Sequence, residues 1–142
     1  MHDGASVPES ERGAEVGSWP SGIRAITLFV EDLAAAKRFY LEVFELPVMF
    51  EDDNSVVFDF GNTIVNLLDA REAPALIEPA AVAGRDAGAR HQFTIEVDDV
   101  DAMCAELGKR GVELLNGPID RPWGIRTASF KDPGGHIWEI AH

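Results

Sequence analysis

The chain lacks the features that would mark it as a secreted, nucleic-acid-binding or membrane protein. Its 142 residues include a single cysteine, Cys104, which excludes an internal disulfide framework and is typical of a reducing cytoplasm. Twelve basic residues against 25 acidic ones give a net charge of -13, so no basic face is present to bind nucleic acid or an anionic membrane surface. No apolar run approaches the roughly 20 residues that span a bilayer. We expect a cytoplasmic protein with no nucleic acid and no membrane as partners.

What the chain does contain is an internal repeat. Residues 30–33 (VEDL) and 97–100 (VDDV) each follow a strand-like run and open a helix-like run. Later in each half, a phenylalanine and a turn lead into another apolar strand, at residues 60–68 and 130–140. A repeat of this size predicts two similar units that share one core across a pseudo-twofold axis. A ligand would lie in the cleft between such units.

The hydrophobic pattern predicts the order strand, helix, three strands in each half. Asp32 and Asp99 are expected to cap the two helices, which should cover residues 33–44 and 100–109. Turns are expected at residues 116–118 and 132–135, where Asn, Asp, Gly and Pro gather. The strands are expected at residues 23–30, 48–50, 55–60, 63–68, 91–97, 112–115, 126–130 and 136–141. The predicted fold class is therefore α+β, with two βαβββ modules that form a curled mixed-sheet cup.

The chain divides into a tail and one domain. Residues 1–20 are rich in Gly, Ser, Glu and Pro, and they cannot bury enough apolar surface to offset their ordering entropy, so a flexible tail is predicted. Residues 21–142 are expected to form a single domain. Module one covers residues 22–69, a crossing loop covers 70–90, and module two covers 91–142.

Two segments carry a resemblance to the vicinal oxygen chelate superfamily, which groups glyoxalase I, bleomycin-resistance proteins and extradiol dioxygenases. Residues 30–40 (VEDLAAAKRFY) are similar to its first helix entry, and residues 130–140 (FKDPGGHIWEI) to its last turn and strand. The resemblance covers about residues 22–142. It implies paired βαβββ modules whose sheets curl into a cup, usually completed in a homodimer.

The resemblance also implies where a metal would bind. In the metal enzymes of the superfamily, the first and last strands of each module supply four ligands, usually His, Glu or Gln; these positions correspond to Ala25, Asn66, Gln92 and Glu139. Alanine has no ligand atom, the two amides are weak oxygen donors, and only Glu139 is an anion. We expect no metal and no other cofactor, with a loosely held divalent metal at Gln92 and Glu139 as the alternative.

His91 and His136 are not expected to replace the missing ligands. Side chains alternate along a strand, so His91, next to Gln92, and His136, three residues before Glu139, should point away from the cup. A one-residue bulge or a slip in register would turn either ring inward. Both histidines are expected to be hydrogen-bonded residues at strand ends.

The side chains expected to line the cup predict a mixed cavity for a small organic ligand. In bleomycin-resistance-like relatives, a Trp-Gly-x-Arg segment resembling residues 123–126 borders the cup. Trp123 can stack on a planar or cationic ligand, and Arg126 can hold a carboxylate, such as that of Glu139; loop packing and a structural ion pair are the alternatives. The candidate ligand-binding residues are Thr27, Phe29, Asn66, Gln92, Thr94, Trp123, Arg126 and Glu139.

The leading functional hypothesis is a homodimeric binding protein that sequesters a small toxic natural product without a metal. The main alternative is a glyoxalase-like lyase, an isomerase or a dioxygenase that uses a degraded metal site or Glu139 as a general base. A third alternative is an antitoxin-like or regulatory partner, which would be a monomer with a filled cup. Trp138 and Cys104 are expected to belong to the core.

Overall fold

The computed structural model describes residue 17 and residues 20–142, so the predicted tail lies almost wholly outside the described residues. Within the described part, no helix is both long and apolar enough to cross a membrane. The elements are β1 (Ala25–Val30), α2 (Leu33–Val43), β2 (Val48–Glu51), β3 (Ser55–Asp59), β4 (Ile64–Asp69), η1 (Ala70–Glu72), α3 (Pro74–Ile77), β5 (Gln92–Glu96), α4 (Val100–Lys109), β6 (Leu114–Asp120), β7 (Arg126–Lys131) and β8 (Ile137–Ala141). The predicted α+β class and the repeated βαβββ order are confirmed.

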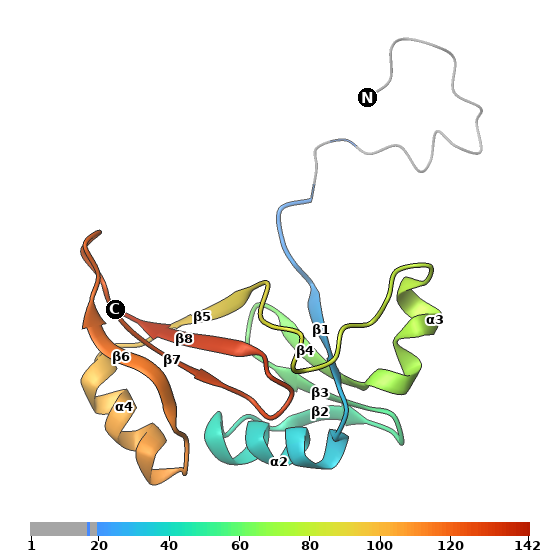
Figure 1. Ribbon diagram of the computed structural model, residues 1–142, viewed down its shortest axis with the longest axis horizontal. Helices are drawn as coiled ribbons and strands as arrows, with labels where there is room; N and C mark the ends of the chain where they lie inside the picture. The colour runs from blue at the N-terminus through green and yellow to red at the C-terminus, as the bar shows by residue number, and fades with distance from the viewer. Residues whose placement is uncertain (1–16, 18–19) are drawn as a thin grey trace.

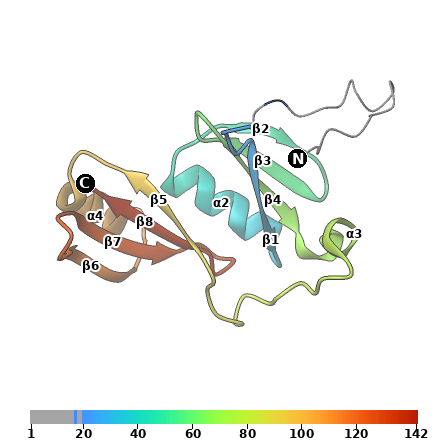
Figure 2. The same cartoon turned by 90° about the horizontal axis from the view of Figure 1, so that it is seen from above.

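Each module forms its own four-stranded sheet, with the strand orders β1-β4-β3-β2 and β5-β8-β7-β6. The β1–β4 and β5–β8 pairs are parallel, and the remaining pairs are antiparallel. Figure 1 shows the two sheets beside each other with α2 and α4 below them, and Figure 2 shows the crossing loop running from α3 to β5. The two sheets do not close into one.

The repeat extends to single residues. Thr27 lies opposite Asn66 in the β1–β4 pair, as Thr94 lies opposite Glu139 in the β5–β8 pair. The two helices also begin in the same way, because Asp32 and Asp99 each accept a hydrogen bond of 3.0 Å from the backbone N–H three residues later.

Alternation along the strands gives each sheet a buried face and an open face. On β1, Leu28 and Val30 are 4% and 1% exposed, whereas Thr27 before them is exposed and Phe29 between them is half-buried. The buried faces and the helices form one core, in which Trp138 of the second module stacks on Phe60 of the first, with ring centroids 5.3 Å apart. The two modules therefore share a core, as the repeat predicts, and Trp138 belongs to it.

Two expected boundaries were wrong. β1 begins at Ala25 rather than at residue 23, and Ile23 is 70% exposed. The expected turn at residues 116–118 lies inside β6, where the pairing with β7 shifts register between Asn116 and Ile119. A bulge takes the place of the turn, and Pro118 is tolerated because β6 is the edge strand of its sheet.

Candidate functional site

The open face of the first sheet carries three of the predicted ligand-binding residues. Thr27 and Phe29 come from β1, and Asn66 comes from β4 directly beside Thr27. Oδ1 of Asn66 is shielded from solvent and accepts no hydrogen bond from the described residues. Leaving a shielded acceptor without a donor costs about 1–3 kcal/mol. A hydrogen-bond donor on a bound ligand would remove that cost if the Asn66 side chain turned this oxygen toward the open face.

The open face of the second sheet carries Gln92, Thr94 and Glu139. The hydroxyl of Thr94 donates to Oε1 of Glu139 at 2.9 Å. Among the ion pairs formed by the described residues, none involves Glu139. A neutral donor therefore orients this carboxylate, and its remaining acceptor sites are available to a ligand.

Trp123 and Arg126 lie apart from these residues, at the β6–β7 connection. Arg126 pairs with Asp101 at 3.0 Å and Asp120 at 2.9 Å, and the hydrogen bonds that it donates to these carboxylates raise its pKa. Trp123 is 70% exposed. The structural ion pair is therefore the role that the described contacts support for Arg126. They join neither residue to Glu139.

The four positions corresponding to the superfamily's metal ligands lie at equivalent points of the two sheets. Ala25 and Gln92 begin β1 and β5, while Asn66 and Glu139 are the third residues of β4 and β8. Within residues 20–142, no three His, Cys, Asp or Glu side chains gather as a metal site would require. A methyl group, two amides and one carboxylate do not fit a transition metal.

His91 and His136 lie on the helix side of the second sheet, as alternation predicts. The ring of His91 packs against Phe93 with centroids 4.9 Å apart. His136 shares its side of β8 with the buried Trp138, and its Nδ1 lies 3.0 Å from Oδ1 of Asp132. The structure thus agrees with the register that leaves Ala25 and Asn66 on the open face.

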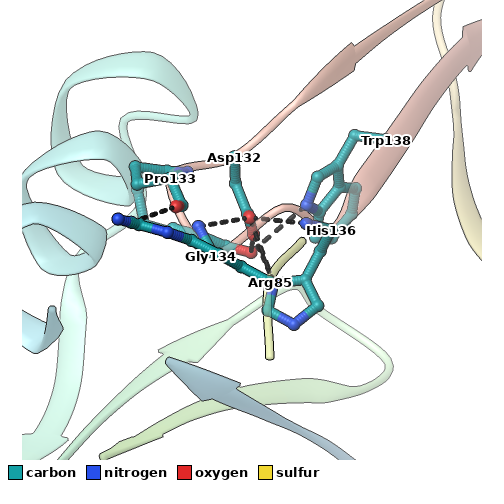
Figure 3. A network of polar contacts seen from close by, with 7 residues as sticks. Arg85, Asp132, Pro133, Gly134, His136 and Trp138 are labelled. Carbon is teal, nitrogen blue, oxygen red and sulfur yellow. Dashed lines mark hydrogen bonds and ion pairs between the residues drawn. The ribbon is translucent and has the colours of Figure 1, made fainter. Parts of the chain in front are cut away.

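A buried polar network also links the modules. The hydroxyl of Tyr40, on α2, donates to Oδ2 of Asp132 at 2.7 Å and accepts from Nε1 of Trp138 at 3.2 Å. Asp132 also accepts from the backbone N–H groups of Gly134 and His136 at 3.0 and 2.9 Å (Figure 3). Burial acts to raise the pKa of Asp132, but the hydrogen bonds from His136 and Tyr40 and the His136 charge outweigh it and lower the pKa.

Sequence reasoning missed this network. Tyr40 is the only tyrosine of the chain, and the sequence pattern at residues 132–135 predicts a turn without a buried partner. Tyr40 and Asp132 are 92 positions apart, and no local spacing pairs residues at that distance. A lone tyrosine on the apolar face of a helix was the one signal that a buried partner was needed, because buried hydroxyl groups are nearly always hydrogen-bonded.

The fold and these residues agree with the result of comparison with known proteins. The family model described as the Glyoxalase/Bleomycin resistance protein/Dioxygenase superfamily matches residues 22–140. The chain therefore belongs to this superfamily.

Individual relatives cover most of the chain. The uncharacterized protein YraH of Bacillus subtilis is 32% identical over 120 residues, which are 81% of this chain and 93% of YraH. The structure of a glyoxalase/bleomycin resistance protein/dioxygenase from Nocardioides has a TM-score of 0.78 and 24% identity, and the match covers 93% of this chain and 89% of that one. A lactoylglutathione lyase from Agrobacterium tumefaciens has a TM-score of 0.69 and 25% identity, with coverage of 86% and 93%.

Proposed function

We propose that this protein binds a small polar organic ligand on the open faces of its sheets without a metal. The observation that carries the proposal is the shielded Oδ1 of Asn66, which has no donor among the described residues. Glu139 adds a second acceptor, oriented by Thr94. Because both groups accept, the ligand should present N–H or O–H donors. Thr27, Phe29 and Gln92 would supply the surrounding polar and apolar contacts.

The specific form of the proposal is sequestration of a toxic natural product in a homodimer. Membership of a superfamily whose name includes bleomycin resistance proteins supports this form. Neither the cavity beside β1 nor the cavity beside β5 has Asn66 or Glu139 in its lining. A second copy would enclose the open faces, and twofold assembly is the commonest form of oligomer. We place the protein in the cytoplasm, in keeping with its single cysteine.

A thermal-shift screen with bleomycin and a panel of small aromatic amines tests this proposal. A ligand at 100 times its dissociation constant should add about 2.7 kcal/mol to the free energy of unfolding. The gain should be lost in Asn66→Leu and Glu139→Gln and kept in Glu42→Gln, an exposed residue on α2. Finding about one tightly bound transition metal per chain, lost in Glu139→Ala, would contradict the metal-free proposal.

The second candidate is a lyase or isomerase that uses Glu139 as a general base, or a metal-dependent dioxygenase. The observation that favours a base is the absence of a cation pairing with Glu139 among the described residues, together with the orienting bond from Thr94. The likeness to a lactoylglutathione lyase gives a first reaction to assay. Under this candidate, purified protein turns over the lyase substrate, Glu139→Gln abolishes turnover, and Thr94→Val reduces it. A complete lack of turnover, with and without added divalent metals, would contradict the enzyme candidate and favour the binding function.

A further inference from the structure

A cavity of about 280 Å³ lies on the border between the modules. Its walls come from the second half of β1, the end of the crossing loop and the turn before β8, and include residues 27–29, 83–85, 88–91 and 134–137. Neither Asn66 nor Glu139 contributes to it. It shares Thr27 and Phe29 with the proposed ligand surface, so it adjoins that surface without including its two acceptors.

The lining concentrates positive and protonatable groups. Arg85, Arg90, His91 and His136 all contribute, and Glu31 is the one acid among the lining residues. No acid of the described residues lies within ion-pair distance of Arg85 or Arg90. The chain has a net charge of -13, so acidic partners for arginine are plentiful elsewhere. Two arginines without acidic partners in one cavity therefore favour the binding of an anion there.

The pseudo-symmetry of the molecule provides an internal comparison. The equivalent place beside β5 and the β3–β4 turn also holds a cavity, of about 410 Å³. Its lining contains no charged residue and includes Phe60, Asn62, Thr63 and Gln92. The fold therefore produces a cavity at both places, whereas the cationic lining is found only at the first. The two arginines come from the crossing loop, which lines only the first cavity, so the charges belong to this loop and not to the repeated strands.

Close backbone packing holds the cationic wall in place. Nη1 of Arg85 donates to the carbonyl of Pro133 at 3.4 Å (Figure 3). Gly135 has a φ of +89°, and a Cβ there would lie 2.9 Å from the carbonyl oxygen of Arg85. A Cβ on Gly134 would lie 2.8 Å from Cε1 of His136. These two glycines let the crossing loop and the imidazole ring approach the turn.

The buried carboxylate of Asp132 orients His136. Because Nδ1 of His136 lies 3.0 Å from Oδ1 of an aspartate whose pKa is lowered, the ring donates its Nδ1 proton inward. Figure 3 shows the other ring nitrogen on the far side of the ring from Asp132. This contact holds the ring of His136 in the wall of the cavity.

We propose that this cavity binds a small oxyanion, the carboxylate or phosphate group of an organic anion, through Arg85 and Arg90 beside the ring of His136. Guanidinium groups bind both oxyanions through paired N–H donors. The proposal goes beyond the ligand surface of Asn66 and Glu139 and does not depend on it.

Titration with inorganic phosphate at constant ionic strength tests the site, with binding followed by the imidazole NMR signals of His136 and His91. We expect saturable shifts and at least about a tenfold loss of affinity in Arg85→Gln/Arg90→Gln, because the charge-assisted contacts of both guanidinium groups are lost. The matched control is Arg24→Gln/Arg38→Gln, which removes the same charge at exposed positions outside the cavity.

Three outcomes decide the proposal. Saturable binding that is weakened in the cavity variant and kept in the control supports it, and a parallel titration with malonate shows whether carboxylate or phosphate is preferred. No saturable shift with either anion overturns it. Equal weakening in both double variants also overturns it, because the response would then report only net charge. Failure here leaves the Asn66 and Glu139 screen unaffected, because the two experiments change different residues.

Discussion

At the scale of single residues, Tyr40 and Asp132 form the buried hydrogen bond that joins the two modules. Both are buried, at 0% and 5% exposure. Tyr40 finds both of its side-chain partners in the other module, whereas Asp132 accepts from Tyr40 and from its own turn. Burial and the neighbouring Asp132 charge raise the pKa of Tyr40 far above its ordinary value, so the phenol keeps its proton and remains a donor. This network fixes where α2 sits against the turn before β8.

Tyr40→Phe should lower the free energy of unfolding by about 1–3 kcal/mol, because Asp132 loses a donor in a buried place. Urea denaturation measures the loss. Phe39→Leu provides a neighbouring core change that leaves the network intact. If Tyr40→Phe is as stable as the wild type, the hydroxyl does not anchor the two modules.

The pH dependence of stability should carry the signature of Asp132. Its pKa is lower in the folded state, so its ionised form stabilises the fold above the ordinary aspartate pKa of about 3.9. That stabilisation is lost as the pH falls below this value toward the folded pKa. Asp132→Asn should be less stable at neutral pH and should lose less further stability between about pH 4 and pH 2. Parallel slopes for the two proteins would contradict this assignment.

At the scale of elements, the matched register of β1–β4 and β5–β8 is the central feature. It places Ala25 where Gln92 stands in the second module, and Asn66 where Glu139 stands. The chemistry of each open face therefore depends on two residues. Substituting these residues would change the chemistry of the face and leave the strand pairing as it is. The hydrogen bond between Thr94 and Glu139 has no counterpart between Thr27 and Asn66, because Asn66 Oδ1 is unpaired within the described chain.

Restoring ligand atoms should therefore restore metal binding. Ala25→His combined with Asn66→Glu would create a set of one imidazole, two carboxylates and one amide, which suits a divalent transition metal. We expect a thermal shift with zinc that EDTA reverses. Arg24→His combined with Asn66→Glu is the control, because residue 24 precedes β1 and lies one position out of register. An equal zinc response in both would show that the four positions do not converge.

At the scale of the whole molecule, the two modules share a core on the helix side and leave their sheets unjoined. The exposed apolar side chains include Met49, Phe50 and Trp123, at 53%, 55% and 70%. A second copy that covers part of this surface would bury apolar area and enclose the open faces.

Light scattering coupled to size exclusion should give a mass about twice the 15.5 kDa of one chain. Phe50→Lys should shift the protein toward the monomer if the edge strand β2 takes part in the contact, because a charge would then be buried without a partner. Lys37→Gln, which removes an exposed ion pair with Glu51, should leave the mass unchanged. A monomeric wild type at high concentration would remove the dimer from the proposal.

The sequence alone determined the module order, the caps at Asp32 and Asp99 and the open face of each sheet, because alternation and capping are local and repeat along the chain. The same local rules placed His91 and His136 on the helix side. Only the tertiary structure decided the partners of Arg126, the Tyr40–Asp132 bond, the bulge at Asn116 and the two cavities beside β1 and β5. The Tyr40–Asp132 bond joins residues 92 positions apart, and the other features depend on how strands and loops pack together, which the spacing within a single sequence does not record.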